Sequence, residues 1–282
     1  MHLYKTSKAI ILKQGSNSFA VNENWDTLIN RENLYEYLLQ LSASEKKMNA
    51  AECDELINEH LLPPIGNQEV WAAGVTYLRS REARMEESKD SSGADCYQKV
   101  YEAERPELFF KALPQRVAGH KQAVHIRRDS SWNVPEPELT LYIDSSGKIQ
   151  AYTIGNDMSS RSIEGENPLY LPQAKIYEKS AAIGPCLYVS KKPIPAETNI
   201  RMSIHRNGQE VFNHSASLSR MKRSLNELAA YLFRECEFPS GCFLMTGTCI
   251  VPPNDFTLNK NDVVQIDIDG IGRLTNTIGI KK

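Results

Sequence analysis

The chain has 282 residues, of which 41% are hydrophobic and 24% charged, a composition typical of a folded globular protein with one large or two modest domains. Its 33 basic and 35 acidic residues leave a net charge of −2, which gives no electrostatic footprint for nucleic acid or an anionic membrane. The opening segment has too short an apolar run for a signal peptide, and no stretch reaches the ~20 apolar residues of a membrane span. We therefore expect a cytoplasmic protein that binds neither nucleic acid nor membrane.

The first 66 residues are predicted to form a small N-terminal α+β domain. Residues 8–23 have the pattern of a hairpin around Gly15, and residues 24–59 carry apolar side chains at helical spacing. Prolines and a glycine in the stretch LLPPIGNQ, residues 61–68, oppose continuation of the helix. We place a domain boundary near residue 66 and assign residues 67–282 to a main domain.

Residues 78–105 are highly charged, and the stretch SKDSSGAD, residues 88–95, separates two helical pieces and is expected to be flexible. Long excursions from compact domains are often lids over a site. The segment is therefore read either as a solvated surface excursion or as a mobile cover.

Beyond Pro106 the sequence becomes rich in strand patterns. One pair of strands is joined by an Asn207-Gly208 turn, and one helix with Leu225, Leu228 and Leu232 on a single face interrupts the strands. The predicted fold class is α+β and mostly β. The predicted strand segments of the main domain are 69–77, 123–128, 138–144, 148–155, 184–190, 199–213, 241–251 and 262–278.

Two glutamates in the stretch Pro135-Glu136-Pro137-Glu138 give the first indication of chemistry. Residues two apart in a strand point to the same side, so these carboxylates project together, with Cα atoms ~7 Å apart at a ~3.3 Å rise per residue. Bare carboxylates would repel each other, whereas a divalent cation between them removes that cost, and oxygen ligands suit Mg²⁺, Mn²⁺ or Ca²⁺. The prolines suit the start of a strand, where ladder donors are not needed.

The hairpin that follows brings a third carboxylate near. With a three-residue turn at 145–147, opposed residue numbers sum to 292, so Glu136 faces Asn156 and Asp157 lies beside the glutamates. Strict alternation points Asp157 to the other face, so Gly155 or a local kink has to turn it inward. Three carboxylates with no basic residue among them favour a metal site over a surface acidic patch.

Motifs of other chemistries are missing from the sequence. The six histidines form no HExxH or other close metal-ligand spacing, and there is no GxSxG elbow, Walker A loop or GxGxxG loop.

Six motifs together resemble the fumarylacetoacetate hydrolase family over residues 67–282. They are PELFFKALP (106–114), PEPEL (135–139), YTIGNDMSSRS (152–162), LPQAKIYEKSAAIGP (171–185), MTGT (245–248) and DVVQIDIDGIGRLTN (262–276). The resemblance implies a β-roll core, a homodimer or homotetramer, and a 2-oxo acid or related substrate. It also implies a divalent metal, Mg²⁺ first and Mn²⁺ or Ca²⁺ otherwise, held by Glu136, Glu138 and Asp157.

Departures from the family pattern narrow the implied activity. Hydrolases of the family carry a catalytic histidine just after the first strand, but no histidine occurs between His60 and His120, and Ser80 or Ala83 takes that place. Thr76 stands where some members have a further aspartate ligand. The stretch TGTCIVPPNDFTL, residues 246–258, is similar to members that dehydrate 2-keto-3-deoxy sugar acids.

This resemblance implies loss of water from a 2-keto-3-deoxy pentonate, such as 2-keto-3-deoxy-D-arabinonate, to give 2,5-dioxopentanoate in pentose catabolism. One alternative is another enzyme of the family, either an acylpyruvate hydrolase or an oxaloacetate decarboxylase or tautomerase. The other is a non-catalytic sugar-acid-binding protein, which would be expected to have lost metal ligands.

The resemblance also suggests roles for residues outside the carboxylate triad. Lys175 and Thr248 match positions that face the ligand, and Arg161 matches a recurring arginine. Lys175 is expected to bind the substrate carboxylate, stabilise an enolate or carry a proton. Glu107 is the first candidate for acid–base work, with a structural salt bridge as the alternative. Glu164 and Glu166 could hold the sugar hydroxyls or act as a base, with a position on a surface loop as the alternative. Ser80 and Arg81 could bind the substrate hydroxyls or carboxylate, with a capping or surface role as the alternative.

Overall fold

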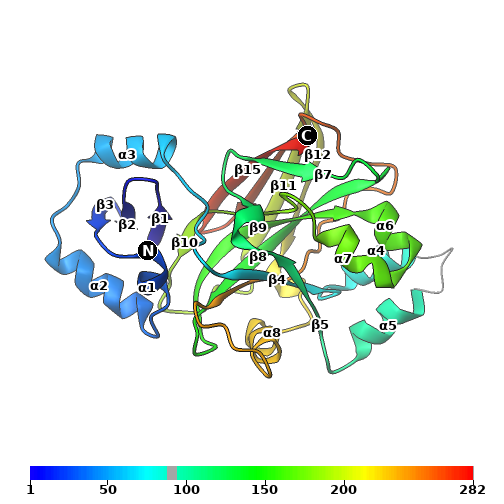
Figure 1. The fold of residues 1–282 in the computed structure, drawn as a ribbon, viewed down its shortest axis with the longest axis horizontal. Helices are drawn as coiled ribbons and strands as arrows, with labels where there is room; N and C mark the ends of the chain where they lie inside the picture. Colours follow the sequence, from blue (N-terminus) through cyan, green and yellow to red (C-terminus); the bar gives the residue numbers. More distant parts are fainter. Residues whose placement is uncertain (88–93, 282) are drawn as a thin grey trace.

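The computed structural model describes residues 1–87 and 94–281, and residues 88–93 of the stretch expected to be flexible lie outside this part. Two sheets dominate the fold, with strand orders β3-β2-β1-β10-β9-β8-β13-β4-β5 and β12-β11-β14-β15-β7 (Figure 1). The prediction of an α+β fold that is mostly β is confirmed. Within the described ranges, none of the helices is long and apolar enough to cross a membrane.

The N-terminal residues continue the larger sheet. They form β1 (His2–Lys5), β2 (Ile10–Gln14) and β3 (Asn17–Val21), followed by α1 (Trp25–Ile29), α2 (Leu34–Ser44) and α3 (Ala50–Glu59). The strand β1 pairs antiparallel with β10 (Ala181–Tyr188), and apolar side chains from α1 and α2 share one core cluster with Tyr142 and Phe243 of the main sheet. The domain boundary near residue 66 stays a prediction.

The remaining strands of the larger sheet form the body of the molecule. They are β4 (Glu69–Gly74), β5 (Glu107–Ala112), β6 (Val117–Ala118), β8 (Asn133–Ile143), β9 (Ile149–Ser160) and β13 (Cys242–Met245). Every residue of β8 is buried, and β9 is buried from Ala151 onward. A pair of long strands that is buried on both faces therefore forms the centre of the fold.

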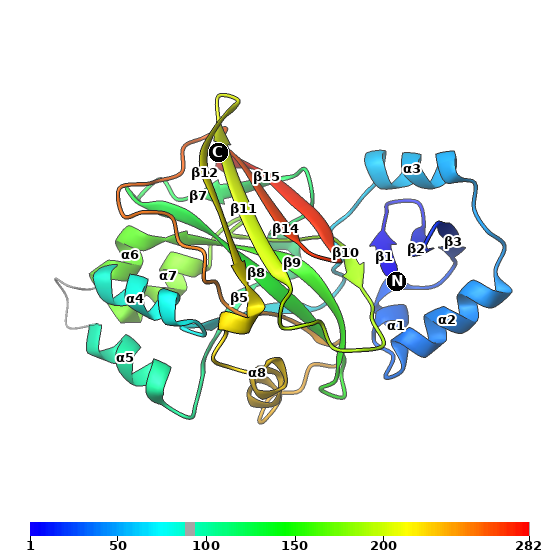
Figure 2. The ribbon, with the colours of Figure 1, turned by 180° about the vertical axis from the view of Figure 1, so that it is seen from behind.

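The second sheet covers one face of the first. It consists of β7 (Ala123–Ile126), β11 (Asn199–Arg206), β12 (Gln209–Ser217), β14 (Val263–Ile268) and β15 (Gly272–Ile280). One apolar cluster joins Leu139 and Leu141 of β8 with Ile204 of β11 and Ile266 of β14, so the main core lies between the sheets (Figure 2). The Asn207-Gly208 turn predicted between β11 and β12 is present, with both residues at positive φ.

Short helices gather at the end of the molecule away from the N-terminal strands (Figure 1). They are α4 (Leu78–Glu87), α5 (Ala94–Glu102), α6 (Arg161–Glu166) and α7 (Leu171–Lys175), with a 3-10 turn at Pro168–Tyr170. Two further 3-10 turns lie at Pro114–Arg116 and Leu218–Arg220. The predicted late helix forms as α8 (Leu225–Leu232) and buries Leu228, Ala229 and Leu232.

The register of the β8–β9 hairpin corrects the prediction for Asp157. The three-residue turn is confirmed, because Asp144 N–H donates to the Lys148 carbonyl and Gly147 has φ +83°. Ile143 still faces Ile149, but Tyr142 faces Ala151, so Gln150 is an extra residue in β9. This bulge shifts the register by one, because two residues then oppose one.

Beyond the bulge, Asp157 lies directly opposite Glu136, and Gly155 lies opposite Glu138. Side chains of directly opposed residues share a face, so Asp157 points toward the glutamates. Of the two predicted alternatives, a turn at Gly155 is wrong, whereas a local irregularity is present as the bulge at Gln150. Gly155 has a different role, since a Cβ there would lie 2.3 Å from Thr140 Oγ1.

The prolines of β8 lie where the strand has only one partner. Strand β13 pairs with β8 only at Thr140–Ile143, whereas β9 pairs along its whole length. Pro135 and Pro137 therefore lie in the part of β8 that β13 does not reach. The N–H groups that prolines lack are not needed for the hydrogen bonds between β8 and β13.

Candidate metal centre

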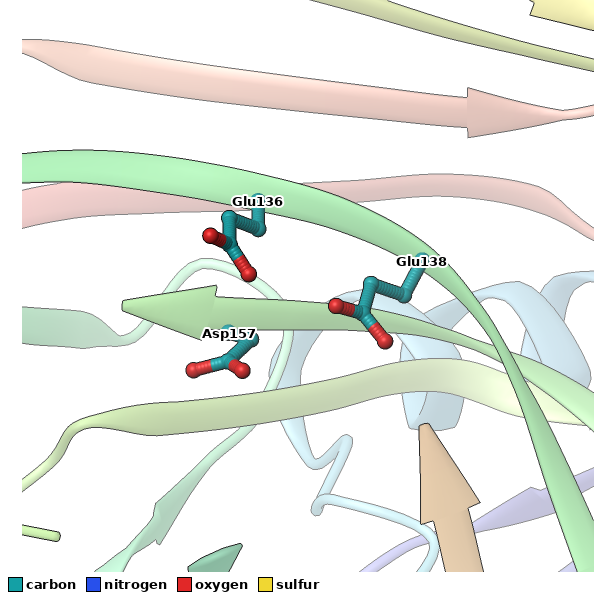
Figure 3. A group of neighbouring side chains, drawn as sticks. All are labelled: Glu136, Glu138 and Asp157. Carbon is teal, nitrogen blue, oxygen red and sulfur yellow. The ribbon is translucent and has the colours of Figure 1, made fainter. Parts of the chain in front are cut away.

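Three buried carboxylates converge on one face of the β8–β9 pair. Glu136, Glu138 and Asp157 each offer an oxygen within 4.8 Å of the others, and their exposed fractions are 4%, 1% and 1% (Figure 3). The two glutamates share a face because they are two apart in β8, and Asp157 joins them through the shifted register.

The pKa of Glu138 is raised well above its ordinary value. Burial is the main cause, and the neighbouring carboxylates of Asp157 and Glu136 raise it further. The N–H of Gly247 opposes this effect by donating to Glu138 Oε2 over 2.5 Å. Gly247 is at φ +91°, and a Cβ there would lie 2.0 Å from Thr76 Oγ1, so this close approach requires glycine.

Contrary to the prediction, basic side chains do lie among the carboxylates. Lys175, at the end of α7, donates from Nζ to Glu136 Oε2 over 2.8 Å, to Asp157 Oδ2 over 3.1 Å and to Ser159 Oγ over 2.6 Å. Lys175 lies 18 residues beyond Asp157, outside the hairpin that carries the triad. Lys175 thus contacts two members of the triad directly, and its role toward the substrate stays a prediction.

A second lysine, Lys111 of β5, also lies in the site and was not predicted from the sequence. Its ammonium group pairs with Asp157 Oδ1 at 2.5 Å and donates to the carbonyls of Met158 and Lys175. Burial lowers the pKa of Lys111, and the nearby Lys175 adds to this, while Asp157 opposes it. A signal was present, because Lys111 interrupts the apolar run LFFKAL of a strand.

Arg161 connects the triad to the start of α6. Its guanidinium group pairs with Glu136 Oε1 at 2.7 Å and with Glu164 Oε2 at 3.3 Å. Arg161 is 2% exposed and Glu164 is 1% exposed, so the three residues form a buried chain of charges. Glu166, by contrast, is on the exposed side of the same short helix.

Two further predicted residues are Thr248, in the segment after β13, and Glu107, at the start of β5. Thr248 is buried next to Gly247, and its hydroxyl bonds to the backbone of Ile250. The Glu107 carboxylate lies over Gly74, where a Cβ would be 1.9 Å from its Oε2. Glu107 also lines a cavity of about 480 Å³ with Leu108 of β5, residues of and after α5, and Pro168 and Leu171.

The two predicted residues of α4 have local contacts. The Ser80 hydroxyl accepts from the N–H of Tyr77 and donates to its carbonyl, which caps the start of α4. Arg81 lies over the ring of Tyr101, with its guanidinium carbon 5.0 Å from the ring centre. Their roles in binding substrate stay predictions.

The residues present fit a hard divalent cation. Three carboxylate oxygens in a compact buried group match the ligand preference of Mg²⁺. A cation at this place would also offset the mutual repulsion that raises the pKa of Glu138. Glu136, Glu138 and Asp157 are the residues that would hold it.

Comparisons with known proteins agree with this geometry. The family model described as fumarylacetoacetate (FAA) hydrolase, C-terminal, matches residues 70–279. A probable 2-keto-3-deoxyxylonate dehydratase of Haloferax volcanii is 46% identical over 227 residues, which is 80% of this chain and 77% of the relative. The 2-dehydro-3-deoxy-D-arabinonate dehydratase of Saccharolobus solfataricus is 44% identical over 217 residues, 76% of this chain and 73% of that protein.

A solved structure extends the likeness to the whole chain. It is 2-keto-3-deoxy-D-arabinonate dehydratase complexed with magnesium and 2,5-dioxopentanoate, with TM-score 0.84 and 33% sequence identity, covering 100% of this chain and 99% of that one. The expected β-roll family fold, including the N-terminal region, is confirmed by this match.

Proposed function

This chain belongs to the fumarylacetoacetate hydrolase family, and we propose that it removes water from a 2-keto-3-deoxy pentonate to give 2,5-dioxopentanoate. The observation that carries this proposal is the buried triad Glu136, Glu138 and Asp157, in a chain whose fold matches a dehydratase structure that contains magnesium and this product. The enzyme is a hydro-lyase that uses Mg²⁺ and takes part in pentose catabolism.

The charges of the site suit an anionic substrate. Four buried carboxylates, those of the triad and Glu164, face three buried cations, which gives one net negative charge when all seven side chains are ionised. A divalent cation turns this into one net positive charge, and a substrate with one carboxylate would neutralise it. The three cations are Lys111, Arg161 and Lys175.

The reaction requires removal of a proton from C3 and departure of the C4 hydroxyl as water. A second proton shift, from C5, then yields the aldehyde, so the product differs from the substrate by one water. A bound divalent cation would act as a Lewis acid toward the carboxylate and 2-keto oxygens of the substrate. Positioned acids and bases typically contribute a further ~10²–10⁴-fold.

The chain's own residues would handle the protons. Lys175 donates three hydrogen bonds in the centre of the site, so it can bind the substrate carboxylate, stabilise the enolate or carry a proton. Glu107 and Glu164 are our candidates for acid–base work. Arg161, Thr248, Ser80 and Arg81 are proposed to bind the substrate. This chemistry needs no hydrolytic histidine, in keeping with the lack of histidine between His60 and His120.

The site residues are well shielded from water. The triad, Lys111, Lys175, Arg161 and Glu164 are each at most 4% exposed. In such a low-dielectric environment, charged groups interact more strongly with a developing negative charge than they would in water.

The test is an assay with purified protein. We incubate it with Mg²⁺ and racemic 2-keto-3-deoxy pentonates and follow 2,5-dioxopentanoate with a coupled semialdehyde dehydrogenase. Product formation that stops on addition of EDTA and returns with Mg²⁺ is the expected result. Cleavage of an acylpyruvate, or decarboxylation or tautomerisation of oxaloacetate, without formation of 2,5-dioxopentanoate would overturn the proposal. We further propose that the protein is cytoplasmic and forms a homodimer or homotetramer. Light scattering on the purified protein measures the oligomeric state.

A further inference from the structure

We propose that Lys111 is a positioning residue of the metal centre. In this proposal its ammonium group holds the Asp157 carboxylate and the end of α7 in place. Lys175 is then the buried lysine that contacts the substrate. The statement about substrate rests on the proposed function, whereas the statement about Asp157 stands independently of it.

Lys111 is fixed by the backbone of two other elements. Its Nζ donates to the Met158 carbonyl of β9 over 3.0 Å and to the Lys175 carbonyl at the end of α7 over 2.5 Å. The third partner is Asp157 Oδ1 at 2.5 Å. Two hydrogen bonds and one ion pair thus connect β5, β9 and α7 through this side chain.

The strand places Lys111 there through an irregularity. In the pairing of β4 with β5, Val70 faces Ala112 and Trp71 faces Phe110, so Lys111 is the extra residue of a bulge. Bulges re-aim side chains and are frequent beside active sites. The side chain is fully buried, which a lysine tolerates only when its charge is paired.

Lys175 differs from Lys111 in the nature of its partners. Its ammonium group donates to three side-chain oxygens, those of Glu136, Asp157 and Ser159. Two of these belong to the proposed metal ligands, whose oxygens change partners when a cation or substrate binds. The carbonyls that hold Lys111 are parts of a strand and a helix end and cannot turn away separately.

The two lysines divide the Asp157 carboxylate between them. Lys111 contacts Oδ1 and Lys175 contacts Oδ2. The contact from Lys111 therefore sets the rotation of the carboxylate and, with it, the direction of the oxygen offered to a cation. Losing groups that orient a metal ligand typically weakens metal affinity ~10–100-fold.

A purely electrostatic role and a positioning role of Lys111 predict opposite changes in Mg²⁺ affinity when the lysine is removed, which makes the proposal testable. Removal of one positive charge from the site would, through electrostatics alone, strengthen the binding of Mg²⁺. Loss of the group that orients Asp157 would weaken it. The direction of the change in Mg²⁺ affinity therefore separates a positioning role from a purely electrostatic one.

The experiment measures Mg²⁺ binding by calorimetry for Lys111→Met, Lys111→Arg and Lys175→Met, together with kcat and KM. We expect Lys111→Met to weaken Mg²⁺ binding ~10–100-fold and to lower kcat at saturating Mg²⁺ more than it changes KM. Lys111→Arg keeps the charge and is expected to weaken binding too, because a planar guanidinium cannot reproduce the three contacts of a compact ammonium. Lys175→Met should bind Mg²⁺ at least as tightly as the parent protein while losing activity.

Lys148→Met is the matched control, because this lysine side chain is 61% exposed and lies at the hairpin turn. It should leave Mg²⁺ affinity and kcat unchanged. Equal or tighter Mg²⁺ binding by folded Lys111→Met, or full affinity in Lys111→Arg, overturns the proposal. If Lys111→Met does not fold, the affinity of Lys111→Arg, with its melting temperature measured in EDTA, decides. Because Mg²⁺ binding needs no substrate, a failed dehydratase assay would leave this result interpretable.

Discussion

The two ends of the β8–β9 hairpin are built from different kinds of interaction. At the turn, Asp144 Oδ1 accepts from the backbone and hydroxyl of Ser146 and from the N–H of Lys148, all within five residues of chain. At the other end, Glu136 and Asp157 contact charged side chains that come from β5, α6 and α7. The turn is therefore a local structure, whereas the metal centre exists only once distant elements have assembled around it.

The bulge at Gln150 connects the two ends. The Gln150 amide donates to Asp144 Oδ2 over 2.6 Å and to the Glu32 carbonyl over 2.7 Å, so the extra residue is anchored both at the turn and on the N-terminal segment. The difference between the ends teaches that one residue left unpaired near a turn can decide which face a distant carboxylate occupies.

The largest effect is expected from Glu136→Gln. It removes a proposed ligand charge and leaves Arg161 and Lys175 with one carboxylate fewer. Because Lewis-acid stabilisation is worth several kcal/mol, kcat/KM should fall by more than ~10³-fold, and calorimetry should detect no Mg²⁺ binding. Glu210→Gln, at an exposed position of β12, is the matched control and should behave as the parent protein. Unaltered Mg²⁺ binding by Glu136→Gln would contradict the assignment of the triad.

Insertion of one alanine after Ala151 should separate the two ends of the hairpin. With this further residue in β9, Asn156 would lie opposite Glu136, and Asp157 would move to the face away from Glu136. We expect loss of Mg²⁺ binding, measured by calorimetry on protein whose circular dichroism shows folded strands.

The matched substitution Gln150→Ala keeps the chain length and the bulge. It should cost only ~1–3 kcal/mol of unfolding free energy through lost hydrogen bonds and leave Mg²⁺ affinity intact. An insertion variant with the Mg²⁺ affinity of the parent protein would show that the register of β9 does not set the position of Asp157.

The site end, unlike the turn, should respond to pH through Glu138. Its raised pKa means that the folded protein without Mg²⁺ retains a proton that the unfolded chain releases. In EDTA, the free energy of unfolding should therefore fall as pH rises above the ordinary glutamate value of 4.5, until the raised pKa is passed.

Mg²⁺ must displace that proton, so the dependence of metal binding has the opposite sign. Below the raised pKa, Mg²⁺ affinity should increase by up to ~10-fold per pH unit, and then level off. Calorimetry across pH measures this slope, with Glu138→Gln as the reference for its contribution to stability in EDTA. A flat Mg²⁺ affinity in the acidic range would contradict the link to Glu138.

The smallest effect is expected at the turn. Gly147 is at φ +83°, where a side chain is disfavoured by roughly 1–2 kcal/mol, and a Cβ would only touch the Phe233 ring at 3.5 Å. Gly147→Ala should lower the free energy of unfolding by about that amount in urea titrations and leave kcat and Mg²⁺ affinity unchanged. A large loss of Mg²⁺ affinity would mean that the two ends are not independent.

Much of the site was predictable because its signals are local. Two glutamates at strand spacing, a turn of three residues and an aspartate one strand later bring three carboxylates into one neighbourhood by simple counting. The prediction that Gly155 turns Asp157 inward failed for an equally simple reason. Counting residues from the turn assumes that every residue of β9 has a partner, and no motif at Gln150 indicates the bulge, which the N-terminal segment helps to anchor.

The cationic half of the site shows the limit of sequence reasoning. Lys175 and Arg161 were found through motifs, but Lys111 was not, although a lysine in an apolar strand is unusual. Its three partners lie in β9 and α7, 46 to 64 residues further along the chain. Only packing of β5 against these elements turns an odd residue into part of the site.

The sequence by itself therefore determined the strand pair, its turn, the glutamate pair and the family, because each depends on side-chain alternation or on short motifs. Tertiary structure decided the register beyond Gln150, the face of Asp157 and the cations that surround it. The physical reason is the range of the forces involved. Turn hydrogen bonds close within a few residues, whereas buried charges are stable only where distant segments supply their partners away from bulk solvent.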